Sequence, residues 1–181
     1  MSSNPSEVAH ERPPQAWVAK LFAQLEGPLV AYIRPRVGGD VEQAQDVVQE
    51  SFVKLCQQRW PEIEKHATAW LYKTSRNRAI DITRREGRMS AVSSGMDVST
   101  VTDRAERGPD KRTEQVEEID RMKLQIRDLP DRQQEILRLR LHDGLSYKQI
   151  AEVTGLTATN VGYLLHQAIA KLRSNMMAEN G

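Results

Sequence analysis

The sequence has little of what a disulfide-bonded, secreted or membrane-spanning protein needs. Only one of its 181 residues is a cysteine, Cys56, so no internal disulfide can form, and a reducing cytoplasm is the simplest location. No stretch approaches the roughly 18 consecutive apolar residues of a membrane span. The first residues, Met1 to Gln15, lack the apolar core of a signal peptide. We therefore expect a cytoplasmic protein with no membrane insertion.

An excess of charge of one sign is also missing. The 26 Lys and Arg residues nearly cancel the 25 Asp and Glu residues, so the whole-chain charge neither predicts nor excludes a polyanionic partner. Strand patterns are scarce as well, because apolar residues rarely alternate with a period of two. Apolar spacings of three and four dominate instead, and they predict an all-α fold.

The helical patterns fall into two blocks, which predict two small helical domains joined by a flexible linker. Gly27-Pro28 is expected to break the first helix, and Trp60-Pro61 to end the second. Between the blocks, periodicity disappears and Ser, Thr, Gly, Asp and Arg dominate; a flexible segment of this length spans roughly 25 to 30 Å. The expected division is a disordered tail at 1–16, a domain at 17–88, the linker at 89–114 and a helix-turn-helix domain at 115–176.

The strongest local signal is Tyr147 to Leu165, YKQIAEVTGLTATNVGYLL, which has the layout of a helix-turn-helix. Small Ala151 allows two helices to approach, and Gly155 suits the positive φ of the turn. Ser146 with Gln149 forms a capping box before the first helix, and Thr157 can cap the second. The alternative is a helical hairpin that packs without contacting DNA.

If the segment binds DNA, the helix after Thr157 enters the major groove. Asn and Gln side chains on such a helix can pair with adenine through two hydrogen bonds. For each single side chain the alternative is ordinary solvated helix surface. The candidates for base and phosphate contacts are Thr159, Asn160, Tyr163, His166 and Gln167.

The helix predicted from about Ala69 to Arg88 carries a basic face. Five arginines and Lys73 oppose only Asp81 and Glu86 between Trp70 and Arg88, and such a face can neutralise phosphates. Trp70 and Tyr72, interleaved with these charges, are candidates for stacking on unpaired bases. The alternative is a solvated charged face with both aromatic residues in the core.

The helix predicted after Gly38-Gly39 carries the opposite charge. Asp40 and Gln43 are spaced as a helix-start signal, and Gly38 to Glu50 contains no basic residue. The exposed side of this helix would repel DNA, so it suits a protein partner, although a merely solvated face is the alternative. The residues predicted to share that side are Glu42, Asp46, Gln49 and Val53.

Three segments together resemble one family. AQDVVQESFVKL from Ala44, WLYKTSRNRAID from Trp70 and LPDRQQEILRLRLHDGLSYKQIAEVTGLT from Leu129 are similar to the second and fourth conserved regions of extracytoplasmic-function (ECF) sigma factors. Their order and spacing also fit. The resemblance covers about Leu21 to Arg88 and Val116 to Arg173.

The resemblance implies a factor that binds core RNA polymerase and directs promoter recognition, DNA melting and transcription initiation. Asp46 and Gln49 match positions that dock on the clamp helices of the beta-prime subunit, within the face Glu42, Asp46, Gln49 and Val53. The loop from Ile63 to Thr68 lies where the family captures a flipped base. The helix-turn-helix, with Thr157 included, would read the minus-thirty-five element, and its preceding helix would meet the beta flap. The residues expected at the melted minus-ten element are Lys73, Arg76, Asn77, Arg78, Arg84, Arg85 and Arg88.

The chain departs from the family at one place. Family members usually carry basic residues in the middle of the recognition helix, where this chain has Gly162, Leu164 and Gln167. Fewer phosphate contacts predict weaker, less salt-sensitive DNA binding by this domain. The promoter sequence, the regulon, the inducing signal and the existence of an anti-sigma partner are left open.

Two rival functions are weaker. A stand-alone helix-turn-helix regulator would use only the last third of the chain and would leave Asp46, Gln49 and the basic helix unexplained. An enzyme is not indicated, because there is no phosphate-binding loop, no metal-ligand spacing among the histidines and no evident nucleophile with its base. Cys56 lies near the apolar side of its helix, which predicts a buried thiol. We expect no cofactor and no metal.

Overall fold

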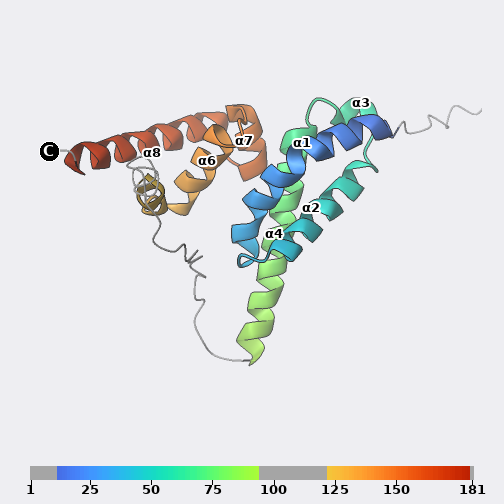
Figure 1. The fold of residues 1–181 in the computed structure, drawn as a ribbon, viewed down its shortest axis with the longest axis horizontal. Coiled ribbons are helices and arrows are strands. Elements are labelled where there is room, and N and C mark those ends of the chain that lie inside the picture. The colour runs from blue at the N-terminus through green and yellow to red at the C-terminus, as the bar shows by residue number, and fades with distance from the viewer. Residues whose placement is uncertain (1–11, 94–121, 180–181) are drawn as a thin grey trace, which may run out of the picture. The chain divides into compact units, whose positions relative to one another are not determined.

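The computed structural model describes residues 12–93 and 122–179, and the side chains of residues 12–87 and 122–177. The chain divides into two compact units, Met1–Thr102 and Asp103–Gly181. Every regular element in the described ranges is a helix (Figure 1), so the all-α fold with two helical domains is confirmed. The expected tail and linker fall largely on 1–11 and 94–121, outside the described residues.

Three long helices make up most of the described part of unit 1. They are α1 (Gln15–Ile33), α2 (Val41–Leu55) and α4 (Ala67–Ser93), joined by the 3-10 helix η1 (Arg34–Val37) and the short α3 (Trp60–Ile63). The long helices pack on one another through an apolar core. Aromatic pairs join α1 to the other two helices. The ring centroids of Phe22 on α1 and Phe52 on α2 are 4.9 Å apart, and those of Tyr32 on α1 and Tyr72 on α4 are 5.1 Å apart.

The first helix is not broken at Gly27-Pro28, which corrects the sequence-based prediction. Helix α1 runs through Pro28 without interruption. Proline lacks the backbone N–H that would bond to the preceding turn, so one helical hydrogen bond is missing there. The turn after Pro28 places Leu29, Tyr32 and Ile33 in the core, each 0% exposed. Burial of this apolar surface offsets the lost bond.

Other differences lie at the ends of helices. Helix α2 ends at Leu55 rather than near Gln58, and part of the expected loop after Trp60-Pro61 is the short helix α3. Helix α4 begins at Ala67, two residues earlier than predicted, and continues to Ser93, inside the expected linker. Helix α1 begins at Gln15, inside the expected tail. Cys56 is exposed, so the prediction of a buried thiol is wrong. It follows the last residue of α2, where the chain leaves the helix and the projected apolar face no longer applies.

Unit 2 contains a helical segment at 122–127 and the helices α6 (Asp131–Leu141), α7 (Tyr147–Thr154) and α8 (Ala158–Glu179). Pro130 is the N-cap of α6 rather than its first helical residue. Helix α8 contacts both α6 and α7. The core comes from all three helices and includes Ile136, Leu139, Ile150, Val161 and Ala168, each 0% exposed.

Two further observations concern the described part of the chain. No helix there is long and apolar enough to cross a membrane. Within the same ranges, no three His, Cys, Asp or Glu side chains gather as metal ligands.

Candidate nucleic-acid and protein interfaces

Helix α2 presents the predicted acidic face to solvent. The Asp40 side chain caps the helix by accepting a hydrogen bond from the backbone N–H of Gln43, 3.0 Å away. Ala44, Val48, Phe52 and Leu55 are buried against the rest of unit 1. This burial leaves the opposite side in water, and Val53 is 59% exposed there. All four residues of the predicted face are exposed: Glu42, Asp46, Gln49 and Val53.

Helix α4 separates its apolar and basic residues as predicted. Leu71, Ser75 and Ala79 are each 0% exposed. Arg84 is exposed and forms an ion pair with Asp81 on its own helix, with 3.2 Å between Nη2 and Oδ1. Arg76 and Arg78 are half-buried, and the side chain of Arg88 lies outside the described set. The exposed members of the predicted set are Lys73, Asn77, Arg84 and Arg85.

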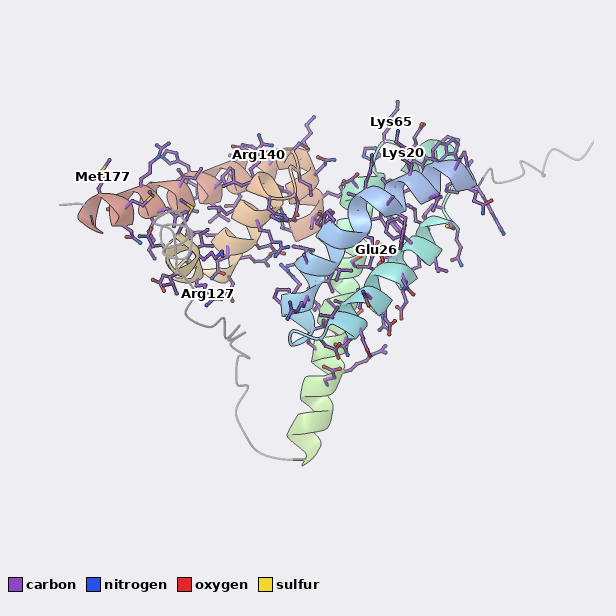
Figure 2. The ribbon with its side chains drawn as sticks, viewed as in Figure 1. Lys20, Glu26, Lys65, Arg127, Arg140 and Met177 are labelled. Atoms are coloured by element: carbon purple, nitrogen blue, oxygen red, sulfur yellow. The ribbon has the colours of Figure 1, made fainter. Side chains whose placement is uncertain are left out.

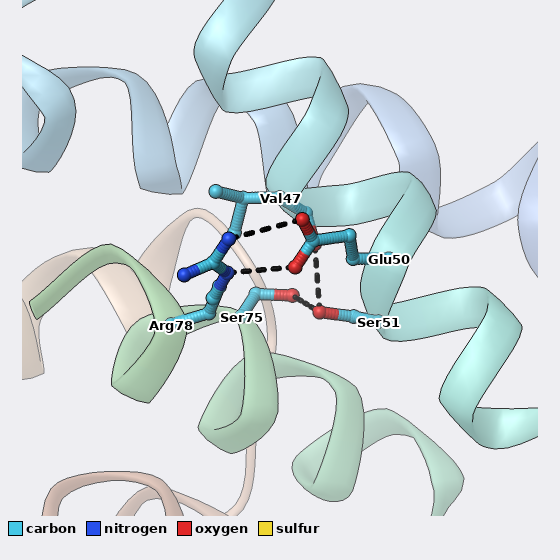
Figure 3. Close-up of polar contacts among 5 residues, drawn as sticks. All are labelled: Val47, Glu50, Ser51, Ser75 and Arg78. Carbon is cyan, nitrogen blue, oxygen red and sulfur yellow. Dashed lines mark hydrogen bonds and ion pairs between the residues drawn. The ribbon is translucent and has the colours of Figure 1, made fainter. Parts of the chain in front are cut away.

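Arg78 is bound to a residue of α2. Its Nε donates to Oε2 of Glu50 at 2.7 Å, and its Nη2 donates to Oε1 at 3.1 Å (Figure 3). These hydrogen bonds lower the pKa of the Glu50 carboxyl below its usual value, and desolvation acts in the opposite direction. They also raise the pKa of the Arg78 guanidinium. The sequence did not predict this pair.

A buried hydrogen bond lies beside this ion pair. The Ser75 hydroxyl donates to Oγ of Ser51 at 2.9 Å, and the Ser51 hydroxyl donates to the backbone carbonyl of Val47 at 2.8 Å. Figure 3 shows both contacts next to Arg78 and Glu50. Nearer the other end of α2, the Gln43 amide donates to the Glu86 carboxylate at 3.1 Å. Helices α2 and α4 are therefore joined by several side-chain bonds.

The aromatic residues near the basic face differ in exposure. Tyr72 is 1% exposed and packs near Tyr32, so it belongs to the core and is not available for stacking on bases. Trp70 is half-buried. The ring centroids of Trp17 and Trp60 lie 4.4 Å apart in an edge-to-face arrangement, which holds α3 against the start of α1.

Only part of the segment expected to capture a flipped base, Ile63 to Thr68, lies between α3 and α4, because Ile63 ends α3 and Ala67 and Thr68 begin α4. Its ends are anchored, because Ile63 is 6% exposed and Ala67 is 3% exposed. Glu64, Lys65 and His66 between them are exposed. The Lys65 side chain points away from the helices of unit 1 (Figure 2). The segment is thus a short exposed turn with two apolar anchors.

Helices α7 and α8 form the predicted helix-turn-helix. Ser146 and Gln149 complete a reciprocal capping box at the start of α7. Gly155 ends α7 with φ of 74°, a backbone conformation that glycine adopts without strain. Thr157 caps α8 by accepting a hydrogen bond from the backbone N–H of Asn160 at 3.2 Å. Local sequence signals therefore fix both the turn and the start of the second helix.

The predicted recognition residues all lie on exposed parts of α8 or at its cap. Thr157, Thr159, Asn160, Tyr163, His166 and Gln167 are exposed. Two of them are bonded to each other, since the Gln167 amide donates to the Tyr163 hydroxyl at 2.7 Å. The Gln133 side-chain amide of α6 donates to the side-chain oxygen Oε1 of Gln167 at 3.4 Å. These contacts pre-orient the polar side chains in the middle of the helix.

One packing detail at the recognition helix was not predicted. An added Cβ at Gly162 would lie 3.4 Å from Cε2 of Tyr147, so the ring of Tyr147 rests against α8 at this position. The guanidinium carbon of Arg140 lies 5.4 Å from the centre of the same ring. No local pattern indicated this contact, because the three residues come from three helices.

Comparison with known proteins gives one family match within each unit. Residues 21–89 match the family described as Sigma-70 region 2, and residues 119–172 match Sigma-70, region 4. The chain is similar to the ECF RNA polymerase sigma factor SigD of Mycobacterium tuberculosis, with 30% identity over 158 residues, which cover 83% of this chain and 72% of that protein. It is also similar to the RNA polymerase sigma factor YlaC of Bacillus subtilis, with 25% identity over 165 residues, 88% of this chain and 91% of that protein.

A solved structure has the same fold. The sigma factor RpoE of Bartonella quintana, crystallised in complex with the anti-sigma factor NepR, superposes with a TM-score of 0.59. The match covers 88% of this chain and 96% of that chain, at 19% sequence identity. At that identity the likeness concerns the fold.

Proposed function

The chain belongs to the ECF sigma factors, which direct core RNA polymerase to promoters and initiate transcription there, and we propose how its residues divide this work. Unit 1 would dock on the polymerase and hold the melted minus-ten element. Unit 2 would read the minus-thirty-five element. The observation that carries the proposal is the segregation of charge in unit 1. An acidic exposed face lies on α2 and a basic exposed face lies on α4, and these two helices pack on each other.

The docking face is Glu42, Asp46, Gln49 and Val53. An acidic helix side with an exposed valine suits a basic, partly apolar protein surface and repels DNA phosphates. We assign it to the clamp helices of the beta-prime subunit. The beta flap would then contact the helix that precedes the helix-turn-helix.

The minus-ten face is on α4. Exposed cations there would neutralise phosphates of the melted strand and release counterions. Exposed Asn77 carries an amide that can hydrogen-bond an unpaired base. The turn at Glu64, Lys65 and His66 would receive the flipped base. The assigned set is Lys73, Arg76, Asn77, Arg78, Arg84, Arg85 and Arg88, within which Arg78 has the separate role described below.

The minus-thirty-five face is on α8. It carries amide, hydroxyl and imidazole groups rather than guanidinium or ammonium groups, so base contacts would rest mainly on hydrogen bonds. The assigned set is Thr157, Thr159, Asn160, Tyr163, His166 and Gln167.

The same proposal covers location and further partners. We place the protein in the cytoplasm, where RNA polymerase acts. Its contribution is recognition, while the polymerase forms the phosphodiester bonds. The RpoE structure contains an anti-sigma factor, and a protein of that class is a candidate partner here.

Abortive transcription tests the docking assignment. Core bacterial RNA polymerase is given a pool of genomic promoter fragments with and without the full-length protein, and Asp46→Ala and Gln49→Ala are compared with wild type. Gln24→Ala, an exposed glutamine on α1, is the matched control. We expect promoter-specific products that require the protein and decrease in the two docking variants only. Protection of a discrete duplex site by the protein alone, with no fragment transcribed, would instead support a stand-alone regulator.

A further inference from the structure

We propose that Arg78 is a positioning residue, which fixes the minus-ten face of α4 to the docking helix α2 through Glu50 instead of binding a DNA phosphate. The inference deepens the proposed function and rests on it. It starts from the bidentate geometry, in which two nitrogens of one guanidinium meet two oxygens of one carboxylate at 2.7 and 3.1 Å. Paired arrangements of this kind fix direction as well as distance.

The pair lies between the two functional faces. Glu50 directly follows Gln49, which is assigned to the polymerase, and Arg78 directly follows Asn77, which is assigned to DNA. The two residues are 28 positions apart in the chain, so the bond joins two helices rather than two turns of one helix. It therefore sets the position of the DNA face relative to the docking face.

Neighbouring contacts support the same role. The buried Ser75–Ser51 hydrogen bond of 2.9 Å joins the next residue of α2 to the preceding turn of α4. The Gln43–Glu86 bond of 3.1 Å joins the helices farther along the antiparallel pair. Arg78 thus belongs to a row of bonds between α2 and α4, and the Arg78 side chain is only 29% exposed.

Arg84 provides the contrast on the same helix. Its side chain is 61% exposed, and its ion pair is with Asp81, three residues earlier on α4. The Arg84–Asp81 pair lies within α4 and makes no bond to α2. The Arg84 guanidinium can therefore turn toward a phosphate without disturbing the packing of the two helices. If Arg78 moved to a phosphate, it would leave the Glu50 carboxylate unpaired.

A charge exchange separates positioning from phosphate binding. The full-length protein is bound to saturating core polymerase, and its affinity is measured for a fluorescent fork DNA with a single-stranded minus-ten segment. We expect Arg78→Ala and Glu50→Ala each to weaken binding by about two- to five-fold. The double variant Glu50→Arg with Arg78→Glu should recover most of the loss. If Arg78 instead binds a phosphate, Glu50→Ala should leave the affinity for the fork DNA unchanged, and the exchanged double variant should bind more weakly than either single variant.

The salt dependence gives a second, independent readout. A lost phosphate contact lowers the slope of log affinity against log salt by about 0.7 to 0.9, whereas misplacement of the face changes affinity with the slope nearly unchanged. Arg84→Ala should lower the slope, and Arg78→Ala should not. A lowered slope in Arg78→Ala would overturn the inference.

Two measurements keep these outcomes interpretable. Tryptophan fluorescence of each variant verifies that unit 1 is folded. Titration of core polymerase verifies that each variant still docks at the concentrations used. If wild type itself gives no promoter-dependent binding with core polymerase, the proposed function fails; if wild type binds and only the exchange fails to recover, the positioning role of Arg78 fails alone.

Discussion

The two buried serines between α2 and α4 should respond unequally to removal of their hydroxyls. Ser51 and Ser75 are 1% and 0% exposed. The Ser51 hydroxyl donates its hydrogen bond to the Val47 carbonyl, and the Ser75 hydroxyl donates to Oγ of Ser51. Ser75→Ala therefore leaves every remaining donor satisfied. Ser51→Ala leaves the Ser75 hydroxyl buried without its acceptor.

The magnitudes follow from this asymmetry. Loss of one neutral hydrogen bond costs about 1 kcal/mol, whereas an orphaned buried hydroxyl costs about 1 to 3 kcal/mol. Each alanine also gains up to about 0.5 kcal/mol of helix propensity. We expect net losses in the free energy of unfolding of about 0.5 kcal/mol for Ser75→Ala and about 1.5 kcal/mol for Ser51→Ala. The double variant loses both hydrogen bonds but leaves no orphan and gains helix propensity twice, so its net loss should be about 1 kcal/mol, less than that of Ser51→Ala alone.

Urea denaturation followed by tryptophan fluorescence measures these changes in the intact chain. All 3 tryptophans, at positions 17, 60 and 70, lie in unit 1, so the signal reports that unit selectively. With a slope of about 1 kcal/mol per molar urea for a domain of this size, Ser51→Ala should shift the midpoint by about 1.5 M. A larger loss for Ser75→Ala than for Ser51→Ala, or additive losses in the double variant, would refute the reasoning.

Three further predictions concern charge and the helix-turn-helix. The hydrogen bonds from Arg78 lower the pKa of Glu50. The Glu50–Arg78 pair therefore stabilises unit 1 at pH values above the ordinary glutamate pKa of about 4.3, and this stabilisation is lost as the pH falls below it. Glu50→Gln should reduce the loss of unfolding free energy between pH 7 and pH 4 by less than about 1 kcal/mol, as urea midpoints at the two pH values will show. Gly155→Ala should destabilise unit 2 by about 1 to 2 kcal/mol, because φ is 74° there; circular-dichroism melts check this, and an unchanged melt of unit 2 contradicts it. In Gly162→Arg the new Cβ lies in ordinary contact with Tyr147, at 3.4 Å. The added cation should steepen the slope of log affinity against log salt for minus-thirty-five duplex DNA by about 1. Anisotropy titrations at several salt concentrations test this, with Gly162→Gln as the uncharged control.

Features with a local cause could be predicted from the sequence. The capping box at Ser146 and Gln149, the turn at Gly155 and the exposed side of α2 each depend on residues only a few positions apart. Helix period and capping chemistry act over such distances, and the structure has all three where the sequence indicated them.

Features decided by packing could not be predicted. Pro28 is a local signal for a break, but burial of Leu29, Tyr32 and Ile33 outweighs it. Glu50 and Arg78 each look like a charge on a solvated face, and nothing within one helical turn of either residue indicates the other. Their bond becomes visible only when α2 and α4 are placed side by side.

The predicted base-contacting part of α8, from Ala158 to Gln167, has no Lys or Arg, and this bears on how the two units share promoter binding. Without cations in that part, unit 2 is expected to contribute little sequence-independent affinity, and its contacts should act mainly on the choice of sequence. If α2 docks on the polymerase as proposed, docking makes each later contact intramolecular and raises its effective concentration, which would supply the missing affinity. We then expect a weak minus-thirty-five contact still to discriminate promoters on the polymerase, and the free protein to bind duplex DNA poorly. We infer that the docking face, more than α8, determines the overall strength of promoter binding.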